Sequence, residues 1–386
     1  MLRLLSLILA HILSSPAASP IPFPLHRLIS AAAPAVSSNP SFAVEDYLVR
    51  TCGLTRDQVL KASTKLSHLR SPTKPDAVIA FLAGLDLSSA QVAAVVAKDP
   101  RLLCAKVGKT LAPVVVGLTG HGLSHTEIAR LVSLVPASIR HRSIVSNLPY
   151  YLSLFGSCEN LLRALKRCDD NFFSADLERV VKPNVALLRE CGLDACDIAK
   201  LCIIVPRALN SRPERLQAMV ACAEGLGVPR GSQMFRHVLQ AVGFRTEECI
   251  ATQVDFLKKT FIWSDAEVRI AVCRAPLLLT RSKESMQHRS EFLINEVGLE
   301  PAYIAHRPVM LMYSLEGRIR PRYYVFKFLM EKGLLHQDRD YYNVLNITEK
   351  VFMEKFICPH KEPAPHLAED YAAACRGEMP TRFRFT

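Results

Sequence analysis

Apolar residues in this chain recur at helical spacing in short runs, and many of the runs end at a proline. The stretch SDAEVRIAVCRAPLLL, residues 264–279, shows the pattern. Ser264 and Glu267 have the spacing of a capping box at the start of a helix. The apolar residues that follow recur every three or four positions, which places them on one helix face. Because proline lacks an N–H and clashes with the preceding turn, Pro276 predicts that the helix ends just before three leucines.

The same pattern occurs three more times without a gap, as SSAQVAAVVAKDPRLL (88–103), SHTEIARLVSLVPASI (124–139) and DACDIAKLCIIVPRAL (194–209). Each copy starts with Ser or Asp and is apolar at its fifth, ninth and sixteenth positions. The thirteenth positions are Pro100, Pro136, Pro206 and Pro276. These prolines are 36, 70 and 70 residues apart, so the repeat is about 35 residues long. Two units therefore lack the proline, and their turns are expected near Asp170 and Val242.

Each proline is followed by a second apolar periodic segment, which predicts a second helix. The segment often ends at glycine, as a left-handed C-cap requires. The expected caps are Gly122, Gly192, Gly227 and Gly298. One such unit cannot bury its apolar faces alone, whereas stacked units can. The sequence thus predicts an all-α protein, a right-angled helical-repeat solenoid or superhelix of about eight units over residues 45–335.

Both ends of the chain differ from the repeats. Residues 1–44 contain two arginines and six prolines but no Asp or Glu, which is typical of an organelle transit peptide. The apolar run at 4–13 leaves a secretory signal as the alternative, but the many unpatterned cysteines would make a poor disulfide scaffold. Residues 336–360 are expected to be a closing segment. Residues 361–386 lack periodicity and are expected to be a disordered tail.

The charge balance points to a polyanionic partner. The chain has 48 Lys and Arg against 36 Asp and Glu, a formal net charge of +12, and without residues 1–44 about +10 remains. Such a balance favours nucleic acid or an acidic membrane surface, although a basic protein without either partner is also possible. No segment reaches the roughly 20 uninterrupted apolar residues of a membrane span.

Catalytic, cofactor and metal motifs are not evident in the sequence. The triplet Gly108-Lys109-Thr110 ends like a phosphate-binding loop, but the glycine required five residues earlier is Leu103. The twelve cysteines include no CxxC pair, so buried thiols are a better interpretation than a zinc site. We therefore expect a protein that is not an enzyme and that needs neither cofactor nor metal.

Basic residues gather just after the repeat prolines and in a later Arg-rich element. Equivalent positions of a solenoid lie along one edge, so these side chains could follow a phosphate backbone. The alternative is a set of solvated surface charges, or of charges that interact with helix C-termini. The candidate nucleic-acid-binding residues are Arg101, Arg140, Arg142, Arg207, Arg212, Arg281, Lys283, Arg318, Arg320 and Arg322.

The chain resembles the mitochondrial transcription termination factor (mTERF) family, in its plant organellar branch. The repeats VCRAPLLL and LVSLVPASI are similar to those of the family, in which a proline follows a β-branched position and precedes an apolar cluster. Its last repeat typically carries Arg-Ile-x-Pro-Arg, matched by residues 318–322, and ITEKVFMEKF matches the closing segment. The resemblance extends over about residues 41–360.

The resemblance implies repeats of two antiparallel α-helices and a short 3-10 turn after the proline. It also implies binding of double-stranded DNA along a basic groove, possible contact with the organellar transcription machinery, and control of transcription. Some plant members act instead on RNA, in intron splicing or ribosomal RNA maturation, and a helical scaffold for a protein partner is an alternative from another class. We expect a monomer, located in mitochondria or alternatively in chloroplasts.

Overall fold

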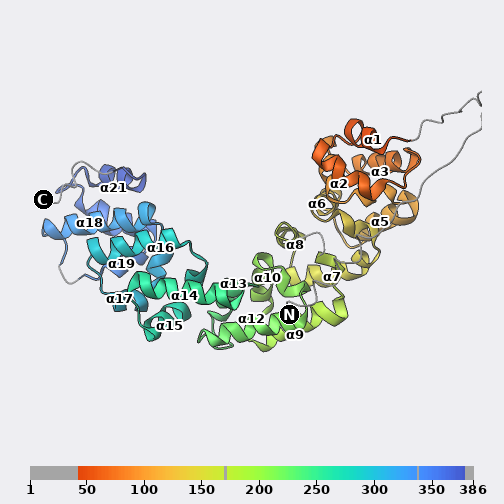
Figure 1. Cartoon of the computed structure of the whole chain (residues 1–386). Helices are drawn as coiled ribbons and strands as arrows, with labels where there is room; N and C mark the ends of the chain where they lie inside the picture. Colours follow the sequence, from red (N-terminus) through yellow and green to blue (C-terminus); the bar gives the residue numbers. More distant parts are fainter. Residues whose placement is uncertain (1–41, 169–171, 337–338, 379–386) are drawn as a thin grey trace, which may run out of the picture. The chain divides into compact units, whose positions relative to one another are not determined.

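The computed structural model describes residues 42–168, 172–336 and 339–378, and over these ranges its regular structure is helical, without a strand. Along the chain the helices follow one another as antiparallel pairs, each beside the next (Figure 1). The expectation of an all-α repeat protein is therefore confirmed. Most of the predicted transit peptide lies outside the described residues, and α1 (Val44–Arg50) begins at its end.

Eight helix pairs can be traced in the described part of the chain between residues 56 and 331, which agrees with the expected number of repeats. The first helices are α2 (Arg56–Leu66), α4 (Ser89–Lys98), α6 (His125–Leu134), α8 (Cys158–Leu165), α10 (Ala195–Ile204), α13 (Phe235–Val242), α15 (Asp265–Arg274) and α17 (Pro301–His306). The second helices are α3 (Thr73–Ala83), α5 (Ala112–Gly120), α7 (Ser143–Phe155), α9 (Lys182–Glu190), α12 (Pro213–Gly225), α14 (Glu247–Phe261), α16 (Lys283–Ser290) and α18 (Arg320–Glu331). Short π turns extend four of the second helices: η2 (Val107–Leu111), η5 (Leu177–Val181), η7 (Glu291–Glu296) and η9 (Leu315–Ile319).

Short helices join the two members of most pairs, at the positions where the prolines predict a turn. They are η1 (Pro100–Cys104), η3 (Pro136–Arg140), η4 (Phe172–Ser174), α11 (Arg207–Asn210), η6 (Pro276–Thr280) and η8 (Pro308–Met312). The capping boxes at Ser88, Ser124 and Ser264 are formed. The sixteenth residues of the four copies, Leu103, Ile139, Leu209 and Leu279, are fully buried. The apolar register predicted from the sequence is thus confirmed.

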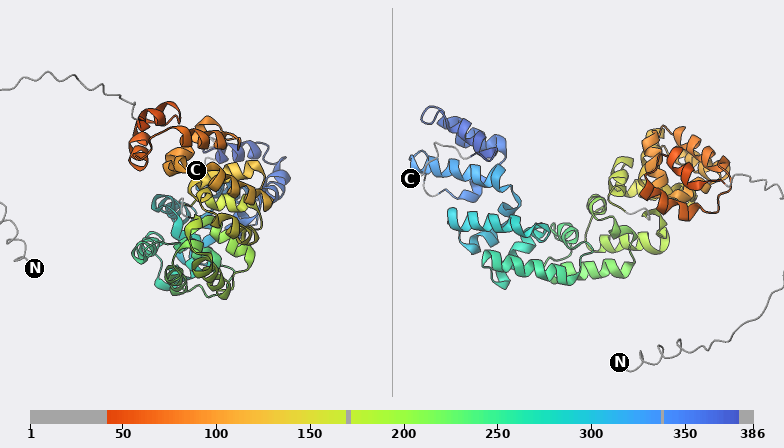
Figure 2. Two further views of the ribbon diagram at one scale, coloured as in Figure 1. Left: turned by 90° about the vertical axis from the view of Figure 1, so that its right-hand side faces the viewer. Right: turned by 45° about the horizontal axis from the view of Figure 1, so that its top comes forward.

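Stacking of neighbouring pairs produces one continuous core. First helices contact first helices, as in α4 with α6, α6 with α8 and α10 with α13. Second helices likewise contact second helices, as in α5 with α7, α9 with α12 and α14 with α16 (Figure 2). Because each pair contacts chiefly its neighbours, a position that recurs in every repeat recurs at regular intervals along one edge.

The first helices differ in length, and the length does not follow the presence of proline. Both α8 and α13, in units without proline, have eight residues, and α4, α6, α10 and α15 have ten. By contrast α2, whose turn also lacks the repeat proline, has eleven residues, and α17, which is followed by Pro308, has six. The turn expected near Asp170 falls at residues 169–171, outside the described residues, and η4 follows directly. The turn expected near Val242 is present: α13 ends at Val242, and Phe244 has a positive φ of 56°.

The residue that ends a second helix adopts a left-handed conformation in repeat after repeat. The expected caps have φ between 78° and 91°. They are Gly122, Gly192, Gly227 and Gly298. Ile262 stands at the same place after α14, with φ 56°, although an L-residue in this region costs about 1–2 kcal/mol. Its side chain is 72% exposed, so burial provides little compensation.

The C-terminal part of the described chain is folded, which corrects the prediction of a disordered tail from residue 361. After α19 (Tyr341–Asn346), α20 (Glu349–Phe352), η10 (Met353–Ile357) and η11 (Cys358–His360), the chain forms α21 (Leu367–Cys375). Leu367, Tyr371 and Ala374 are buried on one face of α21, which packs against α18. Their spacing is helical, but the surrounding charges obscured it in the sequence. Residues 379–386 lie outside the described residues.

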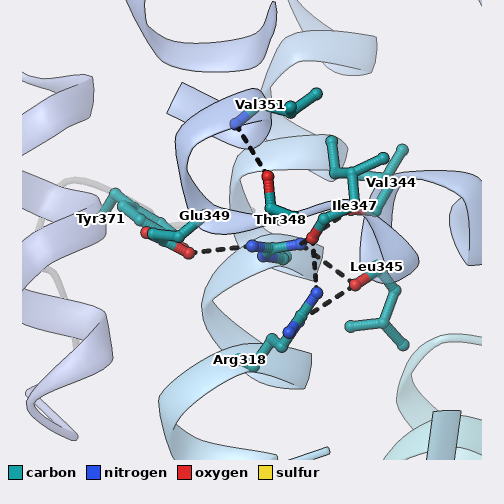
Figure 3. A network of polar contacts seen from close by, with 9 residues as sticks. Arg318, Val344, Leu345, Ile347, Thr348, Glu349, Val351 and Tyr371 are labelled. Atoms are coloured by element: carbon teal, nitrogen blue, oxygen red, sulfur yellow. Dashed lines mark hydrogen bonds and ion pairs between the residues drawn. The ribbon is translucent and has the colours of Figure 1, made fainter. Parts of the chain in front are cut away.

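A buried arginine connects α18 to this C-terminal segment. Arg322 is 0% exposed, and its Nη1 donates to the carbonyl oxygens of Val344, Leu345 and Ile347 at 3.2, 3.0 and 2.7 Å. Its Nη2 contacts Glu349 Oε2 at 2.8 Å, and Glu349 also accepts a hydrogen bond from Tyr371 Oη (Figure 3). The guanidinium thus satisfies carbonyls at the end of α19 that no helical N–H can reach.

The left-handed cap at Ile262 gives a stability prediction. We expect Ile262→Gly to stabilise the protein by about 1 kcal/mol, because glycine removes the strain but increases the entropy of the unfolded chain. The mirror change Gly298→Ile, at a site with no neighbouring atom within 4 Å, should destabilise by a similar amount. Urea unfolding measures both, and a loss of stability in Ile262→Gly would contradict the account.

The Arg322 network gives a second prediction. Arg322→Met should destabilise the protein by about 2 kcal/mol, because the Val344 carbonyl loses its side-chain donor, and Leu345, Ile347 and Glu349 each lose one of their two donors. The matched control Arg320→Met removes a partly exposed pair with Glu316 and should cost about 1 kcal/mol or less. Hydrogen exchange should show lost protection over residues 341–375 in Arg322→Met. Unchanged protection there would contradict a role for the network in docking this segment.

Candidate nucleic-acid interface

The turns that follow the first helices lie next to one another along one edge of the stack. We call this the proline edge: η1, η3, η4, α11, residues 243–246, η6 and η8, with the adjacent ends of the helices that they join. Direct contacts link η1 to η3, η4 to α11, and α13 to η6. Residues after the repeat prolines are therefore brought onto one surface, as the repeat pattern predicts.

At the N-terminal end of the proline edge, four basic groups line one cleft of about 360 Å³. They are Lys65 and His68 from the end of α2, Arg101 from η1, and Arg140 from η3. Arg140 Nε forms an ion pair with Asp99 Oδ2 at 2.7 Å, with a quarter of the arginine side chain exposed. Asp99 interrupts the apolar pattern of its repeat, and this ion pair between neighbouring repeats accounts for the interruption.

The next repeat adds Arg142 at the start of α7. Its side chain is exposed, and Nη2 donates to the carbonyl oxygen of Lys109 in the preceding repeat at 3.4 Å. His141 and Ser143 beside it line a second cleft with Phe173. The basic surface therefore continues from one repeat to the next without leaving the proline edge.

In the middle of the proline edge, three arginines surround a cleft between α12 and α14. Arg207, Arg215 and Arg245 line it, and Arg212 is exposed just before α12. Arg245 Nη1 donates to the carbonyl oxygen of Leu279 at 2.6 Å, which holds that guanidinium against the following repeat. These groups come from two consecutive repeats and form one positively charged region.

Arg281 and Lys283 continue the surface beyond η6, and both are exposed. The Lys283 ammonium lies 5.5 Å from the centre of the Phe256 ring, within the range of a cation–π contact. Nearby Arg289 donates to the carbonyl oxygen of Tyr313 at 2.8 Å. Burial lowers the pKa of Arg289, and the positive charge of Arg281 lowers it further.

The predicted arginines at residues 318–322 have a different environment. Arg322 is fully buried in the network described above, so it cannot contact a phosphate, and that assignment is corrected. Arg318 donates to the carbonyl oxygens of Leu345 and Ile347 (Figure 3). Its guanidinium also stacks on the ring of Tyr313. Burial and the charge of Arg322 lower its pKa. Arg320 is partly exposed and pairs with Glu316 Oε2 at 3.2 Å. The hydrogen bonds that Arg318 and Arg320 donate thus go to groups of the protein itself.

Several basic residues of the proline edge were not predicted from the sequence. Lys65 and His68 precede the first repeat proline, so a search for charges after prolines passes over them. Arg245 follows a turn without proline, although it occupies nearly the same place in its repeat as Arg140. Arg215 lies one helical turn beyond Arg212 and could have been found from that spacing.

The other chemical motifs have structural positions in the repeats. Gly108-Lys109-Thr110 lies in η2, inside a helical segment, and not in a loop after a strand. Among the residues that the structure describes, no three His, Cys, Asp or Glu side chains gather as metal ligands would. Within the same ranges, no helix is both long and apolar enough to cross a membrane.

Comparison with known proteins was made against family profiles and curated sequences. The mTERF family profile matches residues 48–353. Transcription termination factor MTEF18, mitochondrial, from Arabidopsis thaliana is 25% identical over 292 residues, which cover 74% of this chain and 49% of the relative. MTERF8, chloroplastic, of the same plant is 23% identical over 51% of this chain and 39% of the relative.

A third relative, MTERF15, mitochondrial, also from Arabidopsis thaliana, is 24% identical over 48% of this chain and 41% of its own length. The matched regions thus cover half or less of each of these relatives. The family profile, by contrast, extends over most of this chain and covers all eight helix pairs, from α2 to α18. The helical repeats and the profile agree, and the chain belongs to the mTERF family.

Proposed function

We propose that this mTERF-family protein binds double-stranded DNA along the proline edge and thereby regulates transcription of organelle genes. The observation that carries the proposal is the series of arginine and lysine side chains that six of the eight helix pairs present along the proline edge. Repeats present them on a rigid, folded surface, and phosphate contacts of this kind supply affinity without reading sequence. A bound solenoid would obstruct or position the transcription machinery, so the protein acts by binding and not by catalysis.

The residues that we propose to contact phosphates are either exposed on the proline edge or line one of its clefts. They are Lys65, Arg101, Arg140, Arg142, Arg207, Arg212, Arg215, Arg245, Arg281 and Lys283. Within the described residues, no carboxylate lies at ion-pair distance from Arg142, Arg212 or Arg281, so their charges are available to a ligand.

The distribution of aromatic residues favours a duplex over a single strand. Proteins that bind single strands without sequence preference stack bases on accessible aromatic rings. In the described part of this chain, every Phe, Tyr and Trp is buried or half-buried. Contacts to a double-stranded backbone need no such ring, so the exposed cations suit duplex DNA. Structured RNA, on which some plant members of the family act, is the alternative ligand. The binding experiments below distinguish it from duplex DNA.

The proposed compartment is the mitochondrion. The acid-free segment at residues 1–44 starts with an apolar stretch that contains an arginine. The names of the relatives place two of them in mitochondria and one in chloroplasts. Chloroplasts are therefore the alternative.

Removal of three exposed charges tests the interface. The triple variant Arg142→Gln/Arg212→Gln/Arg281→Gln should bind duplex DNA more weakly, and the slope of log K against log salt should fall by about 3. The matched control Arg56→Gln/Arg189→Gln/Lys259→Gln removes equal charge at the opposite ends of the helices. Fluorescence anisotropy over a salt series measures both, with circular dichroism to verify the helices. Equal losses in the two variants would reject the proline edge as the binding surface.

The nucleic acid and the compartment can be tested together. We expect the purified protein to bind a mixed-sequence DNA duplex at least about tenfold more tightly than single-stranded DNA or a structured intron RNA of equal length. Crosslinking in isolated mitochondria and chloroplasts, followed by sequencing of bound DNA and RNA, should recover mitochondrial DNA. Recovery of intron or ribosomal RNA would favour the RNA role, and recovery from chloroplasts would overturn the compartment.

A further inference from the structure

A groove lies along the first helices and extends from the start of α10 to its last residues, Ile203 and Ile204, beside the proline edge. It has a volume of about 520 Å³, within the range of ligand clefts, and it extends from the end of α7 across α8 and α10 to α13. The three first helices contact one another in that order. The groove is therefore built by consecutive repeats and does not depend on any distant part of the chain.

α10 supplies more of the lining of the groove than any other helix. Its lining residues are Ala195, Cys196, Ala199, Lys200, Ile203 and Ile204, and they are flanked by Asn160 and Arg163 of α8 and by Arg236 of α13. The groove thus follows the flank of α10 between its two neighbours.

The floor of the groove is apolar. Ile204 is 36% exposed and is among the few large hydrophobic side chains that the described residues present to solvent. Ile203 is half-buried beside it, and Leu154 and Ala199 complete the floor. Ile203 and Ile204 are the floor residues that solvent contacts, and a partner that covers them would gain the free energy of burying their apolar area.

The rim of the groove is positively charged. Arg163 and Lys200 are exposed, and Arg236 lies at the far side. Arg236 Nε pairs with Asp197 Oδ1 at 3.1 Å, which fixes its position, whereas Lys200 Nζ is 4.0 Å from the same oxygen. The described residues that line the groove include no carboxylate. A ligand that complements this rim carries acidic groups.

We infer that this groove binds an acidic amphipathic helix of a partner protein. Apolar side chains at positions i, i+3 or i+4, and i+7 of that helix would occupy the floor, and flanking Asp or Glu would meet the rim. A nucleic acid would satisfy the rim but leave the isoleucines without a partner, and no exposed ring is present for its bases. A second copy of this chain is disfavoured, because two chains that each carry a formal net charge of +12 repel each other.

The test uses a labelled helical peptide with leucines at those positions and glutamates around them, titrated against the full chain. One control peptide has lysines in place of the glutamates, and another has serines in place of the leucines. We expect saturable binding of the first peptide alone. The protein variant Arg163→Glu/Lys200→Glu should weaken it at least tenfold, and so should Ile204→Glu, whereas Arg56→Glu/Lys259→Glu should not.

Duplex DNA binding is measured on the same proteins, so that this inference and the proposed function can fail separately. The groove variants should retain DNA affinity, because Arg163, Lys200 and Ile204 are not among the proposed phosphate contacts. Equal binding of all three peptides, or equal binding by the groove variants and the wild type, would overturn the inference. Loss of DNA affinity in Arg163→Glu/Lys200→Glu, with competition between DNA and peptide, would identify the groove as part of a nucleic-acid surface and would also overturn it.

Discussion

The proline that ends a first helix is the constraint on which the repeat depends. Its ring clashes with the preceding turn of a helix, and it has no N–H to donate, so the first helix must end at a set length. The apolar residues that follow are then buried between units, as at Leu278 and Leu279, which are both fully inaccessible to solvent. The same few residues therefore end the helix and fill the interface between neighbouring repeats.

A fixed stop also determines where charges lie. Residues a few positions beyond the proline begin the second helix at the same edge in each unit, so Arg142 and Arg212 lie along one edge although they are 70 residues apart in the chain. Two units without the repeat proline keep this arrangement, because the chain turns at η4 and at residues 243–246, and Arg245 lies on the same edge as Arg207. The register of the stack is therefore maintained where the proline is absent.

Arginines of two consecutive repeats have opposite roles. Arg281 is exposed next to η6, whereas Arg322 is enclosed by the carbonyl ends of α19 and by Glu349. Both follow an apolar helical pattern, and both looked like members of one basic stripe. What separates them is whether another segment packs over the position. Here α19 to α21 cover the start of α18, and the guanidinium becomes part of the fold.

The sequence by itself determined the helical class, the repeat length, the caps and the buried register, because these depend on residues close to one another in the chain. Pro276, Ser264 and the apolar spacing between them carry that information locally. Only the tertiary structure decided which cations face solvent, that α21 packs on α18, and that Lys65 shares a cleft with Arg140. Those outcomes depend on contacts between residues 20 to 80 positions apart, and charge or polarity read along the chain does not report what packs against a side chain.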